Sequence, residues 1–361
     1  MRRGRARAVR AGPPVSAREV DVLVVGAGPA GLVAAARLAA LGAGRVEVLD
    51  GDQGAGGAPR YGAHRGYGTW PRVVTGPAYA RRLVAVAQRA GAVVRTGVTA
   101  LDWAGPLALE TAGPLGVETV SARAVVLATG ARERPRAARL VPGTRPAGVY
   151  TTGELQRAVH QFGQHIGTRA VIVGAGGTAP AGEATGPEDA TCAQTATGAE
   201  DAVAAAYAEH AAVTTVRASG ASVVALVTGL SRARTGRAPV ADLRPWRGVP
   251  LLTGATVTEL LGQGRLSGVR VRHRDGGTAV LPCDTVVFTG AFVPDHTLAR
   301  RGGLTLATGV RCPAVDAALR TSRPGVFATG ALVRPTASAP AAARAGARAA
   351  HAVLAHLRDT C

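Results

Sequence analysis

The sequence predicts an α/β fold with parallel sheets, because two apolar strands each lead into a glycine-rich turn. Residues 20–25 read V-D-V-L-V-V and continue into G-A-G-P-A-G at 26–31. Residues 170–173 read A-V-I-V and continue into G-A-G-G-T-A at 174–179. Near-continuous apolar segments suit parallel strands that are buried on both faces, and a strand followed by such a glycine turn is typical of a dinucleotide-binding unit. We therefore predict two Rossmann-like dinucleotide-binding domains.

The composition allows a large folded core and gives no support for a nucleic-acid partner. The chain has 361 residues, of which 47% are hydrophobic and 3% aromatic. All 42 basic residues are Arg, and with 23 acids they give a net charge of +19. The arginines are spread along the chain, without a nucleic-acid-binding motif or an aromatic stacking platform. The lack of Lys excludes a Schiff-base lysine and a P-loop lysine.

The cysteines and the N-terminus limit the chemistry and the location. Cys192, Cys283, Cys312 and Cys361 lie 91, 29 and 49 residues apart, so a local redox dithiol is excluded and we expect no bound metal. No segment approaches the ~18 uninterrupted apolar residues of a membrane span. Residues 1–19 hold six Arg and no apolar stretch of a secretory signal. We expect a basic flexible tail over 1–19 and a cytoplasmic protein without membrane contact.

Each glycine of the first turn has a mechanical reason. Gly26 permits the tight turn, Gly28 lets the backbone approach a pyrophosphate, and Gly31 lets the helix pack closely on the strand. A second strand over 45–49 ends on Asp50, which follows Gly31 by 19 residues. An acid at about this spacing binds a ribose 2′-hydroxyl. The first unit therefore contains strand, turn, helix, strand and acid in the expected order.

An abnormal stretch follows the second glycine turn. From Val171 to Val223, in the next clear strand, is 52 residues, whereas the equivalent step in the first unit is 24, so about 28 residues are surplus. Residues 180–216 contain no Arg and six acids, the last of them Glu209. We interpret this stretch as an inserted acidic loop with a short helix near 201–209. Local divergence of the sequence is the alternative.

The second unit also lacks the acid that binds a ribose. Its strand over 223–227 ends on Thr228, and Arg232 and Arg234 follow at positions where they could meet a 2′-phosphate. Arginine is so frequent in this chain that chance is the simpler explanation of these two. NAD(P) binding therefore stays open, the alternative being a Rossmann fold that serves only as scaffold.

These motifs resemble the two-dinucleotide-binding-domain flavoproteins of the pyridine nucleotide-disulfide oxidoreductase-like superfamily. G-A-G-P-A-G after V-D-V-L-V-V resembles their FAD site, and V-V-L-A-T-G at 125–130 resembles the turn beside the flavin nucleotide. T-V-V-F-T-G at 285–290 resembles the turn that closes the inserted NAD domain, and G-V-F-A-T-G at 325–330 resembles the last strand of the FAD domain.

The resemblance implies how the two domains are arranged along the chain. The second Rossmann-like domain is inserted in the first. The implied pieces are an FAD-binding domain over 20–160 and 312–361 and an NAD(P)-binding-like domain over 165–300, with the acidic insertion at 180–216.

A loop after Asp50 narrows the resemblance. G-G-A-P-R at 56–60, followed by His64 and by G-Y-G at 66–68, resembles the FAD-binding subunits of the sarcosine oxidase alpha, hydrogen cyanide synthase, and opine and proline dehydrogenase group. T-G-P-A-Y-A at 75–80 and T-T-G-E-L-Q at 151–156 resemble the same group.

The motifs and this resemblance together give a candidate set of cofactor-binding residues. The FAD-binding candidates are Gly26, Gly28, Pro29, Ala30, Gly31, Asp50, Gly57, Arg60, Val98, Ala128, Thr129, Gly130, Gly330 and Ala331, and the NAD(P) candidates are Gly174, Gly176, Ala179 and Gly290. Ala331 stands where the family usually has an Asp that binds the ribityl chain, which would weaken FAD binding by about 1–3 kcal/mol. For Arg60 and His64 a plain surface-loop role is an equal alternative.

The resemblance implies a FAD-dependent oxidoreductase. We expect a flavoprotein subunit that oxidises the C–N bond of an amine, imino acid or amino acid, or that relays electrons from a partner subunit, since the flavin carries such chemistry. The alternatives are an NAD(P)H-dependent flavin reductase and a degenerate, non-catalytic FAD-fold protein. We expect a small-molecule substrate and a second flavoprotein or iron–sulfur subunit as partners. No catalytic residue is identified, although His64 and Glu154 are candidates by resemblance.

Overall fold

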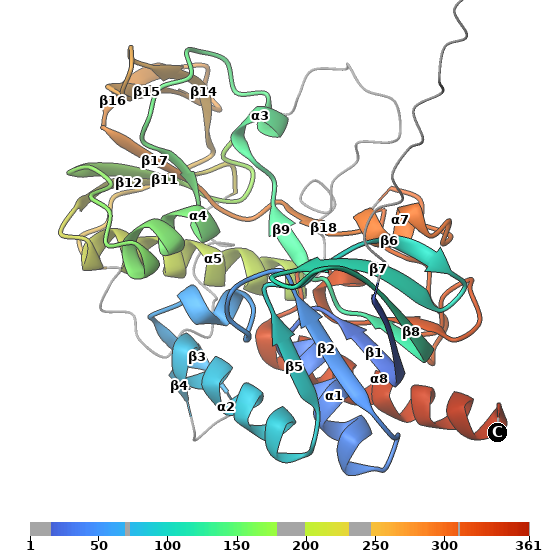
Figure 1. Cartoon of the computed structure of the whole chain (residues 1–361). Coiled ribbons are helices and arrows are strands. Elements are labelled where there is room, and N and C mark those ends of the chain that lie inside the picture. Colours follow the sequence, from blue (N-terminus) through green and yellow to red (C-terminus); the bar gives the residue numbers. More distant parts are fainter. Residues whose placement is uncertain (1–15, 69–72, 179–198, 231–246, 310, 361) are drawn as a thin grey trace, which may run out of the picture.

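The structure is a computed structural model that describes residues 16–68, 73–178, 199–230, 247–309 and 311–360. Several residues singled out from the sequence lie outside these ranges, namely most of the basic tail, Ala179, the first half of the acidic insertion, Cys192, Arg232, Arg234 and Cys361. The described residues form two sheet-based units joined by a short two-stranded connection (Figure 1).

The first unit is built on a seven-stranded sheet. The strands are β1 (Ser16–Val25), β2 (Val46–Asp50), β5 (Val93–Thr96), β6 (Thr99–Gly105), β7 (Ala108–Gly113), β8 (Gly116–Leu127) and β19 (Val326–Ala328). Their order is β5-β2-β1-β8-β7-β6, and β19 pairs with β8. The pairs β2·β5, β1·β2, β1·β8 and β8·β19 are parallel, whereas β6, β7 and β8 form an antiparallel meander.

Three long helices pack on this sheet. They are α1 (Pro29–Ala40), α2 (Gly76–Arg89) and α8 (Ala339–Asp359). In β1 the residues Val22 and Val24 face α1 and α8, whereas Leu23 and Val25 belong to the core on the opposite face. This explains the continuous apolar strand, because a strand covered on both faces needs no polar side. The helices α1 and α8 lie against each other (Figure 1).

The second unit has a five-stranded parallel sheet in the order β10-β17-β11-β12-β13. These strands are β10 (Val149–Thr151), β11 (Arg169–Val173), β12 (Ser222–Thr228), β13 (Leu251–Thr253) and β17 (Thr285–Phe288). Beside it lie the antiparallel strands β14 (Ala255–Leu261), β15 (Gly268–His273) and β16 (Thr278–Pro282), which two glycine-rich turns connect. The helices are α4 (Thr152–Gln156), a π-helical turn at Arg157–Gln161 and α5 (Ala199–Ala218).

The chain crosses between the units twice, through one antiparallel pair. Strand β9 (Ala131–Glu133) leaves the first unit, and β18 (Phe292–Pro294) returns to it and pairs with β9. Figure 1 shows this pair between the two sheets. The chain then continues through α7 (Thr297–Arg301) to β19. The second unit is thus inserted in the first, which confirms the predicted fold class. The shorter elements are Ala58–Tyr61 and Gly330–Leu332 (both 3-10), β3 (Arg65–Tyr67), β4 (Val74–Thr75) and α3 (Arg136–Arg139).

Two sequence expectations differ from the structure. The sequence predicts a tail that reaches residue 19, but β1 begins at Ser16, which pairs with Glu118 of β8. The pairing with β8 gives the backbone of residues 16–19 hydrogen-bond partners. The stretch 180–216 was interpreted as an acidic loop with a short helix. Its second half instead belongs to the 20-residue helix α5, whose Ala212, Val213 and Val216 are buried in the core of the second unit.

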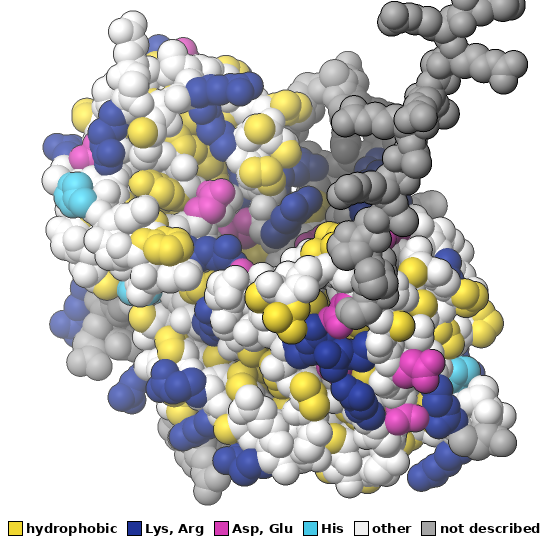
Figure 2. Space-filling model, viewed as in Figure 1, with side chains coloured by type: hydrophobic (Ala, Val, Ile, Leu, Met, Phe, Trp, Pro, Cys, Tyr) yellow, Lys and Arg dark blue, Asp and Glu magenta, His cyan; other side chains and the backbone are white. Residues whose placement is uncertain are grey.

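The arginines do not gather on one surface of the visible face. Figure 2 shows them over both units, with acidic side chains among them. One network is partly internal: Glu47 is 0% exposed, and its carboxylate lies 2.8 Å from Arg95 and 3.6 Å from both Arg18 and Arg45. No helix in the described ranges is long and apolar enough to cross a membrane.

Candidate functional site

The glycines of the first turn divide into two kinds. A Cβ on Gly26, whose φ is +106°, would overlap the carbonyl oxygen of Ala128, and a Cβ on Gly31 would overlap the carbonyl oxygen of Gly26. These two glycines are required by the packing of the chain itself. Gly28 differs, because nothing lies within 4 Å of the position that its Cβ would take. The space beside Gly28 is free for a ligand, as close approach of a pyrophosphate requires.

The N-terminus of α1 offers unused hydrogen-bond donors. The helix begins at Pro29, which has no N–H, and its first intrahelical bond runs from Leu32 N to Gly28 O at 2.9 Å. The N–H groups of Gly28, Ala30 and Gly31 have no acceptor among the described residues, and no side chain caps this helix. Free N–H groups at a helix N-terminus form an anion-binding site.

Asp50 stands at the end of β2, directly beside this turn. Its Oδ2 accepts the N–H of Ala27 at 2.7 Å, and its Oδ1 accepts the N–H of Asp52 at 2.9 Å. Burial raises the pKa of Asp50 above its usual range, and the two N–H groups partly offset this. The backbone N–H of Val98, also buried, donates to Asp50 O at 2.9 Å. These bonds fix the carboxylate of Asp50 beside the first turn, and its contact with a ribose hydroxyl stays a prediction.

The loop after β2 closes over the turn. The N–H of Gly56 donates to Ala27 O at 2.8 Å. Gly57 has a φ of +63°, and a Cβ on it would lie 2.9 Å from the Cα of Gly28. The two consecutive glycines therefore let this loop lie against the first turn, so the loop motif and the turn motif belong to one site.

Arg60 is held inside its own loop. Its Nη1 donates to the carbonyl of Gly54 and lies 3.4 Å from a carboxylate oxygen of Asp52, and its guanidinium lies 5.1 Å from the ring centre of Tyr61. Tyr61 in turn donates to Asp52 at 2.8 Å. These contacts give Arg60 a structural role, and its contact with a phosphate or flavin stays a prediction.

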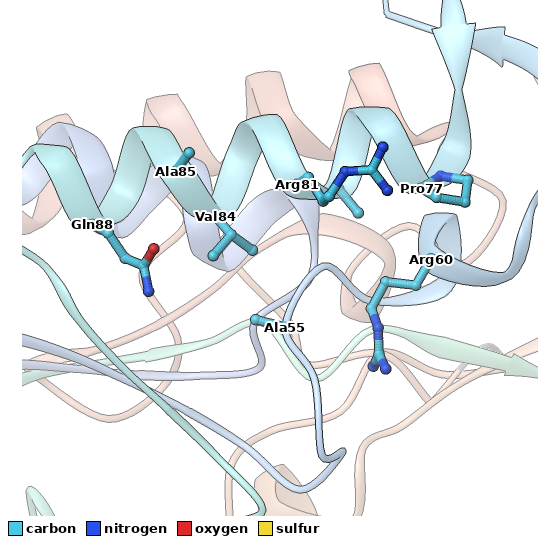
Figure 3. Close-up of a pocket in the computed structure, with 8 residues that line it drawn as sticks. Ala55, Arg60, Pro77, Arg81, Val84, Ala85 and Gln88 are labelled. Atoms are coloured by element: carbon cyan, nitrogen blue, oxygen red, sulfur yellow. The ribbon is translucent and has the colours of Figure 1, made fainter. Parts of the chain in front are cut away.

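A separate cavity lies between this loop and α2. Its volume is about 510 Å³, and Figure 3 shows its walls, which are Ala55, Arg60, Pro77, Ala80, Arg81, Val84, Ala85 and Gln88. Arg81 and Gln88 come from α2 (Figure 3). Neither Gly28 nor Asp50 lines this cavity, so it is distinct from the free N–H groups at the N-terminus of α1.

The A-T-G turn after β8 completes the same edge of the sheet. Ala128 N donates to Val25 O at 2.8 Å, which places this turn beside the first glycine turn. The Thr129 hydroxyl donates to Asp295 O at 2.7 Å, and Asp295 N donates to Gly130 O at 2.9 Å. The turn therefore also anchors the segment that returns from the second unit.

The turn after β19 contacts α1 at the carboxyl edge of the first sheet. Gly330 has a φ of +72°, and a Cβ on it would lie 2.5 Å from the Cβ of Ala30. Ala331 follows, half-buried, in the short 3-10 helix. The hydroxyl of Thr329 is buried and has no hydrogen-bond partner in the part of the chain that the structure describes. The sequence-predicted FAD residues thus converge on the carboxyl edge of one sheet, where ligands of α/β sheets bind.

The second glycine turn has the same motif as the first, and its first glycine bonds to the neighbouring strand in the same way, since Gly26 N donates to Leu49 O at 2.7 Å. Gly174 N donates to Val227 O at 2.8 Å, and Gly177 N donates back to Gly174 O at 3.0 Å. Gly176 has a φ of +65°, and a Cβ on it would lie 3.4 Å from the Cα of Gly229. A Cβ on Gly229 would overlap the carbonyl oxygen of Gly176. This turn folds back on itself and packs against the loop after β12.

Glu209 of α5 occupies the second turn, and the sequence interpretation missed it. Its Oε1 accepts the N–H of Ala175 at 3.2 Å and lies where a Cβ of Gly174 would be. The residue is 4% exposed, and burial raises its pKa to about 7, although the Ala175 N–H lowers it. Strand β12 ends on Thr228 as predicted, and the Thr228 hydroxyl donates to Ala175 O at 2.8 Å.

The surplus length could have revealed Glu209. If about 28 residues are removed after Ala179, Glu209 falls two positions beyond it, in the first turn of the crossover helix. Among the remaining NAD(P) candidates, Gly290 has an open Cβ position, and its carbonyl accepts a hydrogen bond from Arg139 at 2.9 Å. Its contact with a nucleotide stays a prediction.

The two catalytic candidates have different surroundings. Glu154 forms a capping box with Thr151, whose N–H donates to Glu154 Oε2 at 2.8 Å, so Glu154 stabilises the start of α4. His64 lies 5.2 Å from Tyr67 and 5.7 Å from His210, ring centre to ring centre. Burial lowers the pKa of His64 to about 4, with smaller contributions from His210 and His160. His64 is therefore neutral near pH 7, and its Nδ1 is buried without a partner among the described residues.

Other ionisable groups fit structural roles. Glu133, on the connection β9, accepts the N–H of Gly153 at 2.8 Å, and burial raises its pKa to about 7. Cys283 and Cys312 are buried, and burial raises the pKa of the Cys283 thiol to about 12, so it stays protonated and unreactive. The described residues contain no cluster that could hold a metal ion.

The fold and the first turn are those of a protein with two Rossmann-like dinucleotide-binding units. The chain belongs to the pyridine nucleotide-disulphide oxidoreductase family, whose model matches residues 20–346. The family binds FAD and uses NAD(P)H, so FAD is the cofactor that this membership supports.

Curated relatives match only part of the chain. It is 35% identical over 167 residues to a subunit of the opine oxidase of Agrobacterium tumefaciens (strain Ach5), which covers 43% of this chain and 32% of the relative. It is 36% identical over 107 residues to the ferredoxin–NADP reductase of Salinispora arenicola (strain CNS-205), which covers 30% of this chain and 32% of the relative. The matches therefore span about a third of the length of these relatives.

Solved structures share the fold over nearly the whole chain. The thioredoxin reductase of T. acidophilum matches with a TM-score of 0.68 and 21% identity, covering 95% of this chain and 99% of that one. The L-proline dehydrogenase of P. horikoshii matches with a TM-score of 0.65 and 15% identity, covering 96% of this chain and 57% of that one. At these identities the likeness concerns the fold.

Proposed function

We propose that this chain is a FAD-binding subunit of an oxidoreductase that oxidises the C–N bond of an amine, imino acid or amino acid. The observation that supports FAD binding is the set of free N–H groups at the first turn. Three N–H groups, of Gly28, Ala30 and Gly31, meet no acceptor within the described ranges, and Asp50 stands beside them. Such a cradle suits a pyrophosphate with its ribose.

The residues at the carboxyl edge of the first sheet suit FAD as follows. The N–H groups of the first turn would bind the pyrophosphate, and Asp50 would bind the ribose of the adenosine half. The A-T-G turn and the turn at Gly330 would lie along the flavin half, and the buried Thr329 hydroxyl, which bonds to no described residue, is a candidate donor there. The bound flavin supplies a hydride acceptor at N5, and this chain supplies orientation and electrostatics.

The C–N substrate class is supported by the loop after Asp50 and by one relative. The loop over 56–68 resembles the sarcosine oxidase alpha and hydrogen cyanide synthase group, and it lies against the first turn through Gly57. The alignment with the opine oxidase chain points to the same class. Because that relative is named as a subunit, we also propose a partner protein, either a second flavoprotein or an iron–sulfur protein, that receives or delivers electrons.

An NAD(P)H-dependent flavin reductase is the second candidate. Membership of the family and the ferredoxin–NADP reductase alignment favour it. The end of β12 on Thr228, which offers no carboxylate for a ribose, speaks against it. A non-catalytic member of the family is a third candidate, which the missing acid at Ala331 favours.

Anaerobic titration of the purified protein separates these candidates. The protein is purified with added FAD, and its flavin absorbance near 450 nm is followed while a panel of amines and amino acids, NADH and NADPH are added in turn. Bleaching by a panel member supports the proposal. Rapid bleaching by NADH or NADPH alone supports the reductase, and a protein that binds no FAD contradicts both.

A further inference from the structure

We infer that Glu133 and Thr152 form a site for the ammonium group of an amine substrate, at which Glu133 accepts the ammonium proton. This site rests on the proposed function, because it names the residues that would bind the reacting end of the C–N substrate. Two buried polar atoms without partners, the place of Glu133 in the fold and the charges around it support the site.

Glu133 lies where the carboxyl edges of the two parallel sheets meet. It ends β9, which directly follows the A-T-G turn at the carboxyl end of β8 (Figure 1). Its Oε2 accepts the N–H of Gly153 at 2.8 Å, and Gly153 belongs to α4, which directly follows the carboxyl end of β10. Its strand partner Phe292 begins β18, which follows the carboxyl end of β17. Ligands of α/β sheets bind at such strand ends.

Two buried polar atoms at this junction have no hydrogen-bond partner. They are Oε1 of Glu133 and the hydroxyl oxygen of Thr152, and neither forms a hydrogen bond within the described ranges. The Thr152 hydroxyl nevertheless lies close enough to Glu133 to lower the pKa of its carboxyl. A buried polar atom without a partner is costly, and an ammonium group carries enough N–H donors to bond to both oxygens at once. Such a group would therefore satisfy the site.

The charges at the junction leave this carboxylate available to a cation. The charge of the buried Arg139 lowers the pKa of Glu133. Its hydrogen bonds, however, run elsewhere, from Nε to Arg134 O and from Nη2 to Gly290 O, both at 2.9 Å. Arg134 and Glu154 are the other charged groups that act on Arg139, and the carboxylate of Glu154 bonds to the start of α4. Oε1 of Glu133 thus stays free for an incoming N–H donor.

Burial makes Glu133 a suitable acceptor for the proton of an ammonium group. It raises the pKa of the carboxyl to about 7, although the N–H of Gly153 lowers it. An alkylammonium group has a pKa of about 10, so this carboxyl takes its proton at a smaller cost than an ordinary carboxyl does. In this step an N–H bond of the ammonium breaks, an O–H bond forms on Glu133, and the neutral amine keeps the electron pair. Oxidation requires this neutral form, because its lone pair becomes part of the C=N bond.

The test measures ammonium binding and needs no turnover. Butylammonium, which stays charged at both pH values, is titrated by isothermal calorimetry at pH 6 and pH 8 into protein purified with FAD, and butanol is the uncharged probe. Infrared difference spectra against Glu133→Gln follow the protonation of the Glu133 carboxyl. Thr152→Val removes the hydroxyl. Asp284→Asn is the matched control, because Asp284 also accepts backbone N–H groups, from Thr168 and Arg169, but at the amino end of β17.

A pKa of about 7 leaves roughly a tenth of the carboxyl ionised at pH 6 and roughly nine tenths at pH 8. The wild type and Asp284→Asn should therefore bind butylammonium about tenfold more tightly at pH 8 than at pH 6. At pH 8, Glu133→Gln should bind it at least about tenfold more weakly than the wild type and without the pH dependence. Thr152→Val should weaken binding about three- to tenfold and keep the pH dependence.

Three results overturn the inference. They are a folded wild type that binds no butylammonium, the same pH dependence in Glu133→Gln, and a Glu133 carboxyl whose titration the probe does not move. Flavin content and bleaching by the amine panel are measured in the same samples. The expected binding pattern beside a flavin that no amine bleaches would contradict the proposed oxidation alone, whereas a bleached flavin without the pattern would contradict the ammonium site alone.

Discussion

The two glycine turns of this chain share a motif and differ in what their backbone donors contact. Ala27 and Ala175 are the second residues of the two motifs. The N–H of Ala27 donates to Asp50, which comes from the neighbouring strand β2, and the N–H of Ala175 donates to Glu209, which comes from helix α5. Both acids accept the N–H of the second motif residue, Asp50 from the end of a strand and Glu209 from a helix. The same glycine motif therefore accepts an acid from either kind of element, and the motif alone does not decide whether the turn binds an anion.

Within the first turn, Gly31 is packed against the chain, and we expect Gly28 to leave room for a ligand. Gly31→Val places a side chain against the carbonyl of Gly26 and close to the side chain of Val24. We expect a loss of about 3 kcal/mol or more in the free energy of unfolding, because overpacking at a helix–strand contact cannot relax easily. Thermal unfolding followed by circular dichroism measures it. A variant with an unchanged Tm would show that α1 can move away from the strand.

Gly28→Ala is the counterpart that spares the fold. Its Cβ enters open space, and φ at this position is −80°, which any residue adopts. We expect an unchanged Tm and a loss of about 10- to 100-fold in FAD affinity, because the methyl group occupies the approach of the pyrophosphate. FAD titration of the apoprotein measures it. Equal affinities for the wild type and this variant would place the cofactor elsewhere.

These two variants also show what the sequence could predict. The order of strand, turn and helix around Gly26 predicted the fold and the open space beside Gly28, because these sequence patterns are local. The sequence did not reveal that Glu209 is buried, since a composition rich in acids suggested a solvated loop and the contact with Ala175 spans 34 residues. It also could not tell that Arg60 bonds within its own loop, because this depends on the path of the chain at Gly54.

Asp50→Asn tests the acid that bonds to the first glycine turn. The amide can accept one of the two N–H bonds from Ala27 and Asp52 but leaves the other facing its NH₂ group. We expect FAD affinity to fall by about 1.5–3 kcal/mol, the range for a hydrogen bond to a charged group. Thr228→Val is the control in the second turn, where we expect unchanged FAD affinity. If both variants weaken FAD equally, the effect is one of general stability.

Glu209, the acid that bonds to the second glycine turn, makes the stability of the protein depend on pH. The pKa of Glu209 is about 7 in the folded protein and about 4.5 when exposed, so the folded state binds more protons between these values. The free energy of unfolding therefore falls as pH rises from about 4.5 to about 7, and Glu133 acts in the same direction. Glu209→Gln removes this titration, and relative to the wild type it should gain on the order of 2 kcal/mol between pH 5 and pH 8. Urea unfolding at both pH values measures the gain. Equal pH dependence in the wild type and Glu209→Gln would mean that water or a cation reaches Glu209, and the second turn would then be more open than the contact with Ala175 implies.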